Sequence, residues 1–488
     1  MAKSRKNPRL NSLSAMLSKT DFEKLFREQI PFEPTSGQSE AIGKLSSFVC
    51  EKSENQLFIL KGYAGTGKTT LVSALVNALD AIHGRTILLA PTGRAAKVFS
   101  VYSGKKAYTI HKHLYRVQVK DGMAQFKRKE NKTCNTLFIV DEVSMIGNGN
   151  QGDSLIGSHS LLDDLFDFVF EGENCKILFI GDDAQLPPVG AEESPALDVE
   201  YLNSLYHLNI QQFQLTEVVR QAYDSGILFN ANILRGKISK ENFVPPLFSQ
   251  KSYPDFQRIN GGELEEELNT LFSRNEEDDI VIITRSNKRA YIFNREIRNR
   301  ILYRENEIAT GDFLMAVKNN YYWLDEDSEA GFIANGDIME ILAINKQTEL
   351  YGFHFADVTV RLCDYPNYPH IDIRIILESL SCEGASLSGE QNHQLYLAVA
   401  EDYADIASKR QRYLKIKNDP YLNAVQVKYS YALTCHKTQG GQWKNVLIDS
   451  PYLKDGVADK EYLRWLYTAV TRATDKVYLI NFDDQMFA

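Results

Sequence analysis

GYAGTGKTT, residues 62–70, has the spacing G-x-x-x-x-G-K-T of a loop that cradles nucleotide phosphates. The apolar run 56–60 before it is typical of a buried parallel strand, and residues 71–76 after it suit the start of a helix. In this context the glycines let backbone N–H groups turn toward an anion, and the helix dipole adds positive charge. The stretch therefore predicts an α/β domain that binds ATP or GTP. We expect the nucleotide to contact Gly62, Ala64, Gly65, Thr66, Gly67, Lys68, Thr69 and Thr70.

Lys68 is expected to reach the β- and γ-phosphates, and the Thr69 hydroxyl to bind Mg²⁺. A second apolar run, LFIV at 137–140, ends in Asp141 and Glu142. An acidic pair after a strand is often a helix cap. Behind a phosphate loop, we interpret Asp141 as a second Mg²⁺ ligand and Glu142 as the residue that polarises the attacking water. Phosphoryl transfer needs positioning and charge neutralisation, and these residues supply both.

Two more apolar runs lead into polar loops. Residues 176–180 precede GDDAQLPPV, whose two prolines fix the loop. Gln185 in that loop would lie at the carboxyl edge of the sheet, where open α/β folds bind ligands, so it is a candidate γ-phosphate sensor. Residues 86–90 precede PTGRAAK, which suits a helix start and a second anion site.

The bulk composition is that of a globular protein of two to four domains, with 488 residues, 43% hydrophobic and 24% charged. No apolar run is long enough for a membrane span. The net charge of −9 argues against a uniformly basic surface, but a local cleft can still bind nucleic acid. Six cysteines without a C-x-x-C pair indicate reduced thiols in a cytosol-like, cytoplasmic compartment. We interpret residues 1–20 as a basic flexible tail.

The elements GYAGTGKTT, LLAPTGRAAK, TIHKHL, FIVDEVSM and GDDAQLPPV follow one another in one order. This order resembles the motif series of superfamily 1 helicases, most closely the RecD-like and Dda-like branch, over Gln38 to Arg472. The resemblance implies two RecA-like P-loop motor domains, at 21–260 and 261–488. It also favours ATP over GTP, because Gln38 matches the residue that bonds the adenine edge in this family.

Later motifs carry further implied roles. LTEVVRQ at 215–221 resembles motif IV, which makes Arg220 a γ-phosphate contact. YTAVTRA at 467–473 resembles motif VI, in which Arg472 would be an arginine finger worth roughly 10³–10⁵ in turnover. YALTCHKTQGG, ending at residue 441, resembles motif V. The residues that the resemblance places on a DNA backbone are Thr92, Gly93, Arg94, His111, Lys437 and Thr438.

Two insertions are expected. Asp-Gly at 121–122, between alternating runs, is a strong hairpin signal within about 112–130. The family places a strand-separating pin here, with Met123 or Phe126 as the apolar contact. Alternating runs between about 338 and 428 predict antiparallel strands, and the resemblance implies an SH3-like β-barrel. Helices expected at about 391–417 fit that barrel poorly, and their role stays open.

The sequence thus predicts an ATP- and Mg²⁺-dependent DNA helicase that acts on single-stranded and forked DNA, as a monomer. Polarity of 5′→3′ is implied by the resemblance alone. Repair or recombination proteins are candidate partners. An RNA helicase or ribonucleoprotein remodeller is the nearest alternative, because backbone contacts do not by themselves distinguish the sugar. A non-motor P-loop switch is another alternative, although the presence of both Arg220 and Arg472 argues against it.

Overall fold

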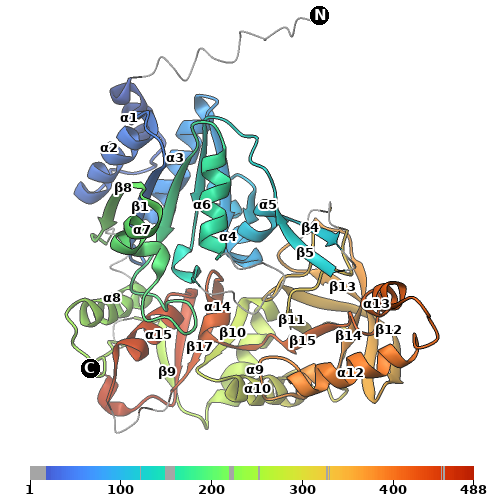
Figure 1. Ribbon diagram of the computed structural model, residues 1–488. Helices are drawn as coiled ribbons and strands as arrows, with labels where there is room; N and C mark the ends of the chain where they lie inside the picture. Colours follow the sequence, from blue (N-terminus) through green and yellow to red (C-terminus); the bar gives the residue numbers. More distant parts are fainter. Residues whose placement is uncertain are drawn as a thin grey trace, which may run out of the picture.

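The computed structural model describes residues 18–120, 123–148, 160–218, 225–250, 253–325, 328, 330–365, 367–451, 453 and 457–487. Figure 1 shows two α/β lobes, one above the other, with a smaller β-domain beside the lower lobe. Within the described ranges, no helix is long and apolar enough to cross a membrane. All six cysteines are free thiols.

The first lobe is built on a six-stranded, wholly parallel sheet. Residues 56–60 alternate between its faces: Phe58 and Leu60 join the apolar cluster of one face, and Leu57 and Ile59 that of the other. Because both faces are covered, this strand reads as a continuous apolar run. In spatial order the strands are β3 (Ala107–Thr109), β2 (Arg85–Ala90), β6 (Thr136–Val140), β7 (Lys176–Gly181), β1 (Gln56–Gly62) and β8 (Asn209–Leu215). The helices are α1 (Lys19–Glu28), α2 (Ser36–Cys50), α3 (Lys68–Ala81), α4 (Gly93–Ser103), α5 (Ile110–Leu114), α6 (Leu161–Glu171) and α7 (Val199–Tyr206).

The second lobe has a five-stranded parallel sheet. Its order is β16 (Ala432–Thr434), β10 (Ile280–Thr284), β17 (Trp443–Asp449), β18 (Ala473–Ile480) and β9 (Phe256–Ile259). Its helices include α8 (Gly226–Ser239), α9 (Leu264–Arg274), α10 (Asn287–Glu296), α14 (Cys435–Thr438) and α15 (Lys460–Val470). The structure corrects the predicted boundary at 260, because β9 pairs with β18 and belongs to this sheet. A four-residue strand in a Pro-containing stretch is too short to show a pattern in the sequence.

The β-domain is a closed barrel of β11 (Phe313–Ala316), β12 (Ile338–Leu350), β13 (Phe353–Leu362), β14 (Ile371–Ile376) and β15 (Val425–Tyr429). The predicted barrel is confirmed, but its start is corrected. The first barrel strand, β11 at Phe313–Ala316, lies well before the predicted limit of 338. After β14 come α11 (Glu378–Ser381), α12 (Gly389–Glu401) and α13 (Lys409–Lys417), which confirm the expected helices. We call α12 and α13 the arm.

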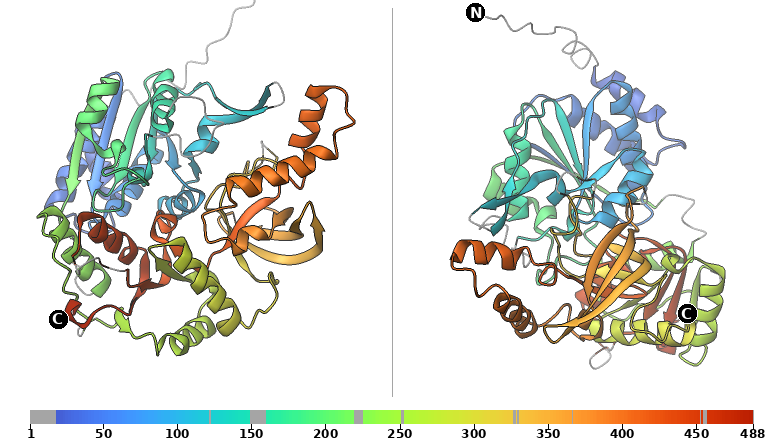
Figure 2. Two further views of the ribbon diagram at one scale, coloured as in Figure 1. Left: turned by 60° about the horizontal axis from the view of Figure 1, so that its bottom comes forward. Right: turned by 90° about the vertical axis from the view of Figure 1, so that its right-hand side faces the viewer.

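The predicted hairpin is present as β4 (Tyr115–Lys120) and β5 (Met123–Arg128), paired antiparallel with Lys120 opposite Met123. Its turn, and the side chains of 117–126, lie outside the described residues. The contact roles of Met123 and Phe126 therefore stay predictions. Figure 2 shows the hairpin and the arm projecting from the same side of the molecule.

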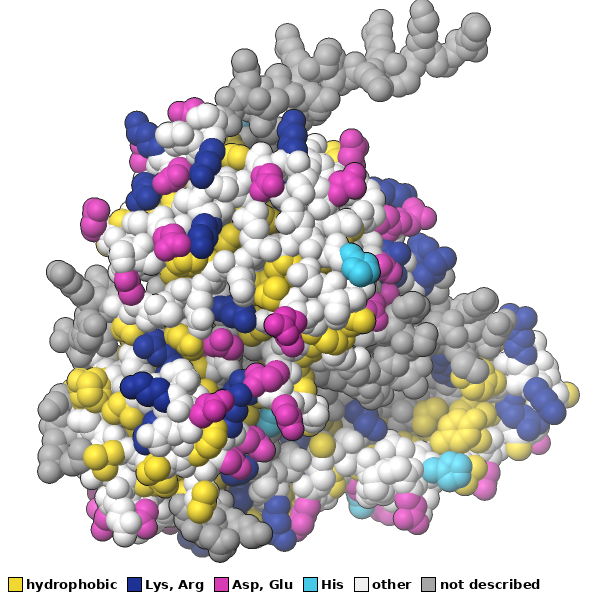
Figure 3. Space-filling view, turned by 60° about the vertical axis from the view of Figure 1, so that its left-hand side comes forward, with side chains coloured by type: hydrophobic (Ala, Val, Ile, Leu, Met, Phe, Trp, Pro, Cys, Tyr) yellow, Lys and Arg dark blue, Asp and Glu magenta, His cyan; other side chains and the backbone are white. Residues whose placement is uncertain are grey.

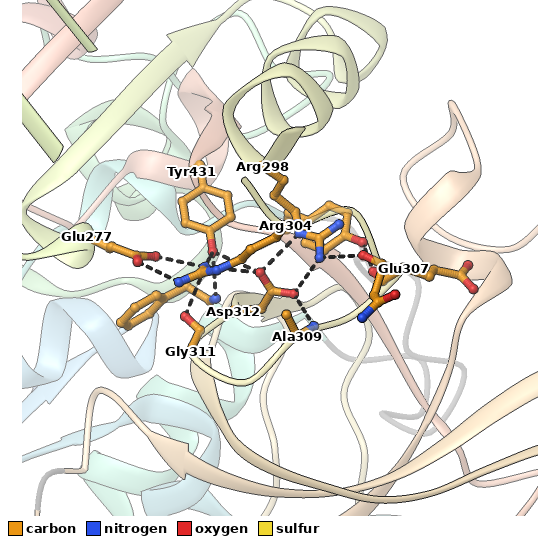
Figure 4. Close-up of polar contacts among 11 residues, drawn as sticks. Glu277, Arg298, Arg304, Glu307, Ala309, Gly311, Asp312 and Tyr431 are labelled. Atoms are coloured by element: carbon orange, nitrogen blue, oxygen red, sulfur yellow. Dashed lines mark hydrogen bonds and ion pairs between the residues drawn. The ribbon is translucent and has the colours of Figure 1, made fainter. Parts of the chain in front are cut away.

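A buried ion network fixes the barrel to the second lobe (Figure 4). Asp312, with no exposed surface, accepts hydrogen bonds from Arg298 Nε at 3.0 Å and Arg298 Nη2 at 2.9 Å. Arg304 Nη1 lies 3.1 Å from the same carboxylate, and Arg304 Nη2 lies 2.6 Å from Glu277 Oε1. The Tyr431 hydroxyl donates to Asp312 at 3.2 Å. The carboxylate that begins the barrel is thus saturated by groups of the motor lobe.

Asp312→Ala leaves two guanidinium groups without their shared buried partner. We expect it to lower the free energy of unfolding by about 3–5 kcal/mol. Glu40→Ala breaks the exposed Lys44–Glu40 pair (3.0 Å) and should cost less than about 1 kcal/mol. Urea unfolding followed by tryptophan fluorescence compares the two, and equal shifts would contradict the role given to Asp312.

Candidate nucleotide site and strand grips

The phosphate loop has the conformation that its glycines allow. Gly65 and Gly67 have φ of 75° and 80°, and Gly67 caps α3. A Cβ on Gly62 would lie 2.8 Å from Lys68 Cγ, so a side chain there would displace the lysine. Lys68 Nζ donates to the carbonyls of Gly62 and Tyr63 and lies 3.8 Å from Asp182 Oδ2. The loop therefore keeps its cation inside the cradle.

Gln38 braces this loop from behind. Its side chain is 2% exposed, and Nε2 donates to the Thr66 carbonyl at 3.1 Å. Its Oε1 accepts from Thr35 N at 3.0 Å, which completes a capping box on α2. The pattern Thr35-x-x-Gln38 was a visible signal for this bracing role. The adenine contact of Gln38 stays a prediction, because both ends of the amide have protein partners.

The acidic pair lies at the end of β6, beside the loop. Asp141 accepts hydrogen bonds from the Tyr102 hydroxyl and, at 2.8 Å, from Glu142 N. Glu142 has φ of 51°, in the left-handed region, and ends the extended chain before the short turn Val143–Met145. Burial raises the pKa of both carboxyls, and the cations Lys68 and Arg472 oppose that rise. The site thus offers oxygen ligands of the kind that Mg²⁺ prefers.

These groups share one cavity of about 650 Å³, lined by Lys68, Thr69, Asp141, Glu142, Gln185 and Arg472. Gln185 is 8% exposed, and its Oε1 is buried without a hydrogen-bond partner among the described residues. A buried orphan acceptor at this place suits a group that would orient a water. The glycine cradle, the paired carboxylates and this amide together fit a nucleotide with Mg²⁺. Arg220 lies outside the described residues, and its predicted contact stays a prediction.

Arg472 enters the cavity from the second lobe. It follows α15, is 4% exposed, and its Nη1 lies 3.7 Å from Glu142 Oε1. Its Nε donates to the Thr468 carbonyl at 3.1 Å, which fixes the stem of the guanidinium. The fold therefore brings together Glu142 and Arg472, which lie 330 positions apart in the chain.

Other side chains of α15 also reach the first lobe, and sequence reasoning missed them. The Tyr467 hydroxyl accepts from Ala64 N of the phosphate loop at 2.8 Å and donates to Asp182 Oδ2 at 2.6 Å. Burial and the Asp182 charge raise the pKa of this phenol well above its usual value, which keeps it a donor. Two further contacts lie on the same face: Thr468 Oγ1 accepts from Leu186 N at 2.9 Å, and Arg464 donates to the Asp183 carbonyl at 3.0 Å. The i, i+4 spacing of Arg464, Thr468 and Arg472 was the available signal.

We call the residues predicted to hold a DNA strand the grips. Thr92, Gly93 and Lys437 among them lie beside the barrel. Thr92 caps α4 by accepting from Ala95 N at 3.2 Å. A Cβ on Gly93 would lie 2.7 Å from Asp337 Oδ1, so a side chain there would displace the Asp337 carboxylate of the barrel loop. Lys437 donates to Asn335 Oδ1 of the same loop, and burial lowers the pKa of this lysine to about 8. Loop 335–337 therefore touches a grip of each motor lobe.

Three other predicted contacts are placed differently. Arg94 stacks on the Trp443 ring, 3.9 Å from its centroid, at the junction of the lobes. Thr438 has no exposed surface and donates to the Cys435 carbonyl at 2.7 Å, so its side chain closes a turn and is not available to a strand. A strand contact of Thr438 would have to use its backbone, and it stays a prediction. His111 is half-buried, with its ring 5.8 Å from that of Tyr115, and its strand contact stays a prediction.

Two protein families match parts of this chain. The AAA domain family matches residues 34–243, and the UvrD-like helicase C-terminal domain matches residues 429–480. The ATP-dependent DNA helicase dda of Enterobacteria phage T4 is 26% identical, over 91% of this chain and 99% of its own. An uncharacterised protein of Acanthamoeba polyphaga mimivirus is 23% identical over 90% and 98%. The ATP-dependent RecD2 DNA helicase of Deinococcus radiodurans is 30% identical over 43% of this chain, which spans only 25% of that protein.

Solved structures of similar extent include a Pif1 helicase from Bacteroides in complex with ADP-AlF3 and single-stranded DNA. It is 15% identical, covers 94% of this chain and 95% of its own, and has a TM-score of 0.47. The Pif1 helicase from Candida albicans is 15% identical over 93% and 95%, with a TM-score of 0.44.

Arg472→Ala removes the guanidinium that the second lobe contributes to the cavity. We expect nucleotide turnover to fall by roughly 10³-fold or more, while nucleotide binding is kept, because the phosphate loop is intact. Steady-state phosphate release and binding of a fluorescent nucleotide measure the two quantities separately. Equal loss of binding and turnover would mean that Arg472 acts only by holding the lobes together.

Tyr467→Phe is the comparison variant, on α15 just before Arg472. It keeps the ring and removes one hydroxyl, which leaves Asp182 short of a donor at a cost of about 1–3 kcal/mol. We expect turnover to fall by about tenfold, since 1.4 kcal/mol corresponds to that factor, and so far less than for Arg472→Ala. If turnover fell as much as in Arg472→Ala, the effect of Arg472 would come from the lobe interface as a whole and not from its guanidinium.

Proposed function

Because this chain belongs to the superfamily 1 helicases, in the RecD-like and Dda-like branch, we propose that it is an ATP-dependent DNA helicase that moves 5′→3′ on a single strand and opens forks. The observation that carries this proposal is the approach of Arg472, from the second motor lobe, to Glu142 in the first. A site completed by both lobes makes turnover sensitive to their relative position. A P-loop switch with a site in one lobe has no need of such a group.

The residues divide the chemistry as follows. Lys68 and the loop N–H groups hold the phosphates, and Thr69 and Asp141 would hold Mg²⁺, which neutralises charge on the transferred phosphoryl group. Glu142 accepts a proton from, or orients, the attacking water, with Gln185 as its neighbour in the cavity. Arg472 stabilises the negative charge that develops. Its position ties this step to closure of the two lobes.

Movement follows if closure changes the grip on a strand. Thr92 and Gly93 begin α4 in the first lobe, and Lys437 lies on α14 of the second. These grips belong to different bodies, so opening and closing the lobes changes the distance between them. A strand held alternately by each would advance in one direction. The reverse polarity, or RNA as the preferred track, is a separate outcome of the experiment below.

The protein is also proposed to act as a monomer on single-stranded and forked DNA, with repair or recombination proteins as candidate partners. Its six free thiols support a reducing, cytosol-like compartment.

The central experiment compares duplexes with a 5′ tail and with a 3′ tail. We expect ATP-dependent unwinding of the 5′-tailed duplex only, and stronger stimulation of ATP hydrolysis by single-stranded DNA than by RNA of the same sequence. Lys68→Ala removes the phosphate-binding ammonium and should abolish both activities. Unwinding from 3′ tails alone would overturn the polarity, and hydrolysis indifferent to any nucleic acid would overturn the motor.

The hairpin β4–β5 is proposed as the wedge that separates the strands, since it is a regular antiparallel pair that projects from the first lobe. Deleting residues 121–124 shortens it without touching the sheet below. We expect loss of unwinding with unchanged DNA-stimulated ATP hydrolysis, because the nucleotide site and grips remain. Parallel loss of both activities would show that the hairpin supports the fold and does not act as a wedge.

A further inference from the structure

The arm is the part of the chain that the proposed function leaves unused. It leaves the barrel after β14 and returns to it at β15. Leu395, Val399 and Ile416 pack it against Phe353 and Phe355 of β13, so its base is fixed by a small apolar cluster. Figures 1 and 2 show that it extends on the side from which the hairpin projects. A helical excursion that a five-stranded barrel does not need for closure requires another explanation.

The charged residues of α13 all have the same sign. Its sequence, KRQRYLKIK at 409–417, has five cations and no acid. Arg412 is used internally, since its guanidinium donates to the carbonyls of Ala404 and Ile406. The other four, Lys409, Arg410, Lys415 and Lys417, have no ion pair and no side-chain hydrogen bond within the described structure.

Some surface cations on other helices have an acidic partner. Arg27, Lys44 and Arg300 each pair with a glutamate four residues earlier in the chain. On the face in Figure 3, acidic and basic side chains are interspersed over the motor lobes. Four unpaired cations on one short helix repel one another, and the chain as a whole has a charge of −9. Such a cluster is stabilised when an anionic partner binds it.

The cationic surface continues beyond the helix. Asn423 Nδ2 donates to the Lys417 carbonyl at 2.6 Å, and the Asn423 carbonyl accepts from Trp323 Nε1 at 2.8 Å. These bonds place the loop after β11 beside the end of α13. That loop adds the exposed Lys318 and Tyr322, which is 38% exposed. Exposed acids lie on α12 and on the turn before α13, at Glu401, Asp402 and Asp405, so the cationic part of the arm is α13 itself together with this loop. There the unpaired cations outnumber the exposed rings, which favours phosphates over stacked bases as the ligand.

We propose that the arm, through Lys409, Arg410, Lys415 and Lys417, binds the phosphate backbone of duplex DNA at the fork. This inference rests on the proposed function, because it is the hairpin wedge that puts the duplex on this side of the molecule. Duplex DNA presents closely spaced phosphates to a helix nine residues long. Each phosphate neutralised changes the slope of log K against log salt by about −0.9 on B-DNA, so four cations account for a slope of up to about −3 to −4.

The test replaces the four cations with glutamine, a good helix former, to give Lys409→Gln, Arg410→Gln, Lys415→Gln and Lys417→Gln together. A control variant removes two exposed lysines of the motor lobes that have no ion pair, Lys52→Gln and Lys240→Gln, and so tests the effect per charge removed. Fluorescence anisotropy measures binding to a 5′-tailed fork, to the same tail without duplex and to a blunt duplex, each over a series of salt concentrations.

We expect the wild type to bind the fork more tightly than the tail, and the arm variant to lose that difference together with most of the blunt-duplex binding. Its salt slope on the fork should flatten by up to about 3–4, one unit or slightly less for each cation removed. Tail binding and tail-stimulated ATP hydrolysis should be unchanged, and the control variant should behave as wild type. A fork-to-tail ratio that survives the four substitutions would overturn the proposal, as would an equal loss on tail and fork.

Failure of the proposed function gives a different result. If no nucleic acid stimulates hydrolysis in the wild type, the motor is wrong, but the blunt-duplex comparison between wild type and the arm variant still decides the role of the arm. Circular dichroism of the arm variant shows whether α12 and α13 remain folded. If helix is lost, the single variants Lys409→Gln and Arg410→Gln at the exposed start of α13 should each flatten the slope by about one unit.

Discussion

The arrangement of the two motor lobes depends on a buried guanidinium in one lobe whose counter-charge lies in the other. Arg472 is 4% exposed, and among the described residues of its own lobe its guanidinium donates to two carbonyls and a hydroxyl, all of them neutral. The carboxylate that balances it is Glu142, 3.7 Å away in the first lobe. Taking an arginine out of water costs several kcal/mol unless a charge compensates it. The position of the two lobes and the charge state of the acidic pair are therefore linked by one interaction.

The rest of the interface supports that contact. Tyr467 connects the phosphate loop to Asp182, and Arg464 and Thr468 hold the loop that carries Gln185. All four residues lie on or directly after α15, so a rotation of this one helix moves them together. A group bound in the cavity would meet the phosphate loop, the acidic pair and this helix at once. The cavity and the interface between the two lobes thus share the same side chains.

Much of this arrangement could be predicted from the sequence, for physical reasons that differ between elements. The phosphate loop and the strands β1, β6 and β7 were predictable because buried parallel strands read as apolar runs and the glycines leave a fixed spacing. The barrel and its helices were predicted in kind, but β9 and β11 were missed, since strands of four residues leave no periodic signal. Arg472 came from family resemblance, and the i, i+4 spacing was the one signal for Arg464, whereas the contacts of Tyr467 arise only when the two lobes pack together.

The side chains predicted to hold DNA show where such reasoning ends. Thr438 has the right place in its motif, yet its hydroxyl is consumed by the Cys435 carbonyl, and Arg94 is stacked on Trp443. Motif position indicates the element that faces a strand, but not which atoms of it remain available. The same distinction explains how an acidic chain can bind a polyanion. Cations that are close together and have no intramolecular partner are available to an anion, and α13 keeps four of them within the described structure.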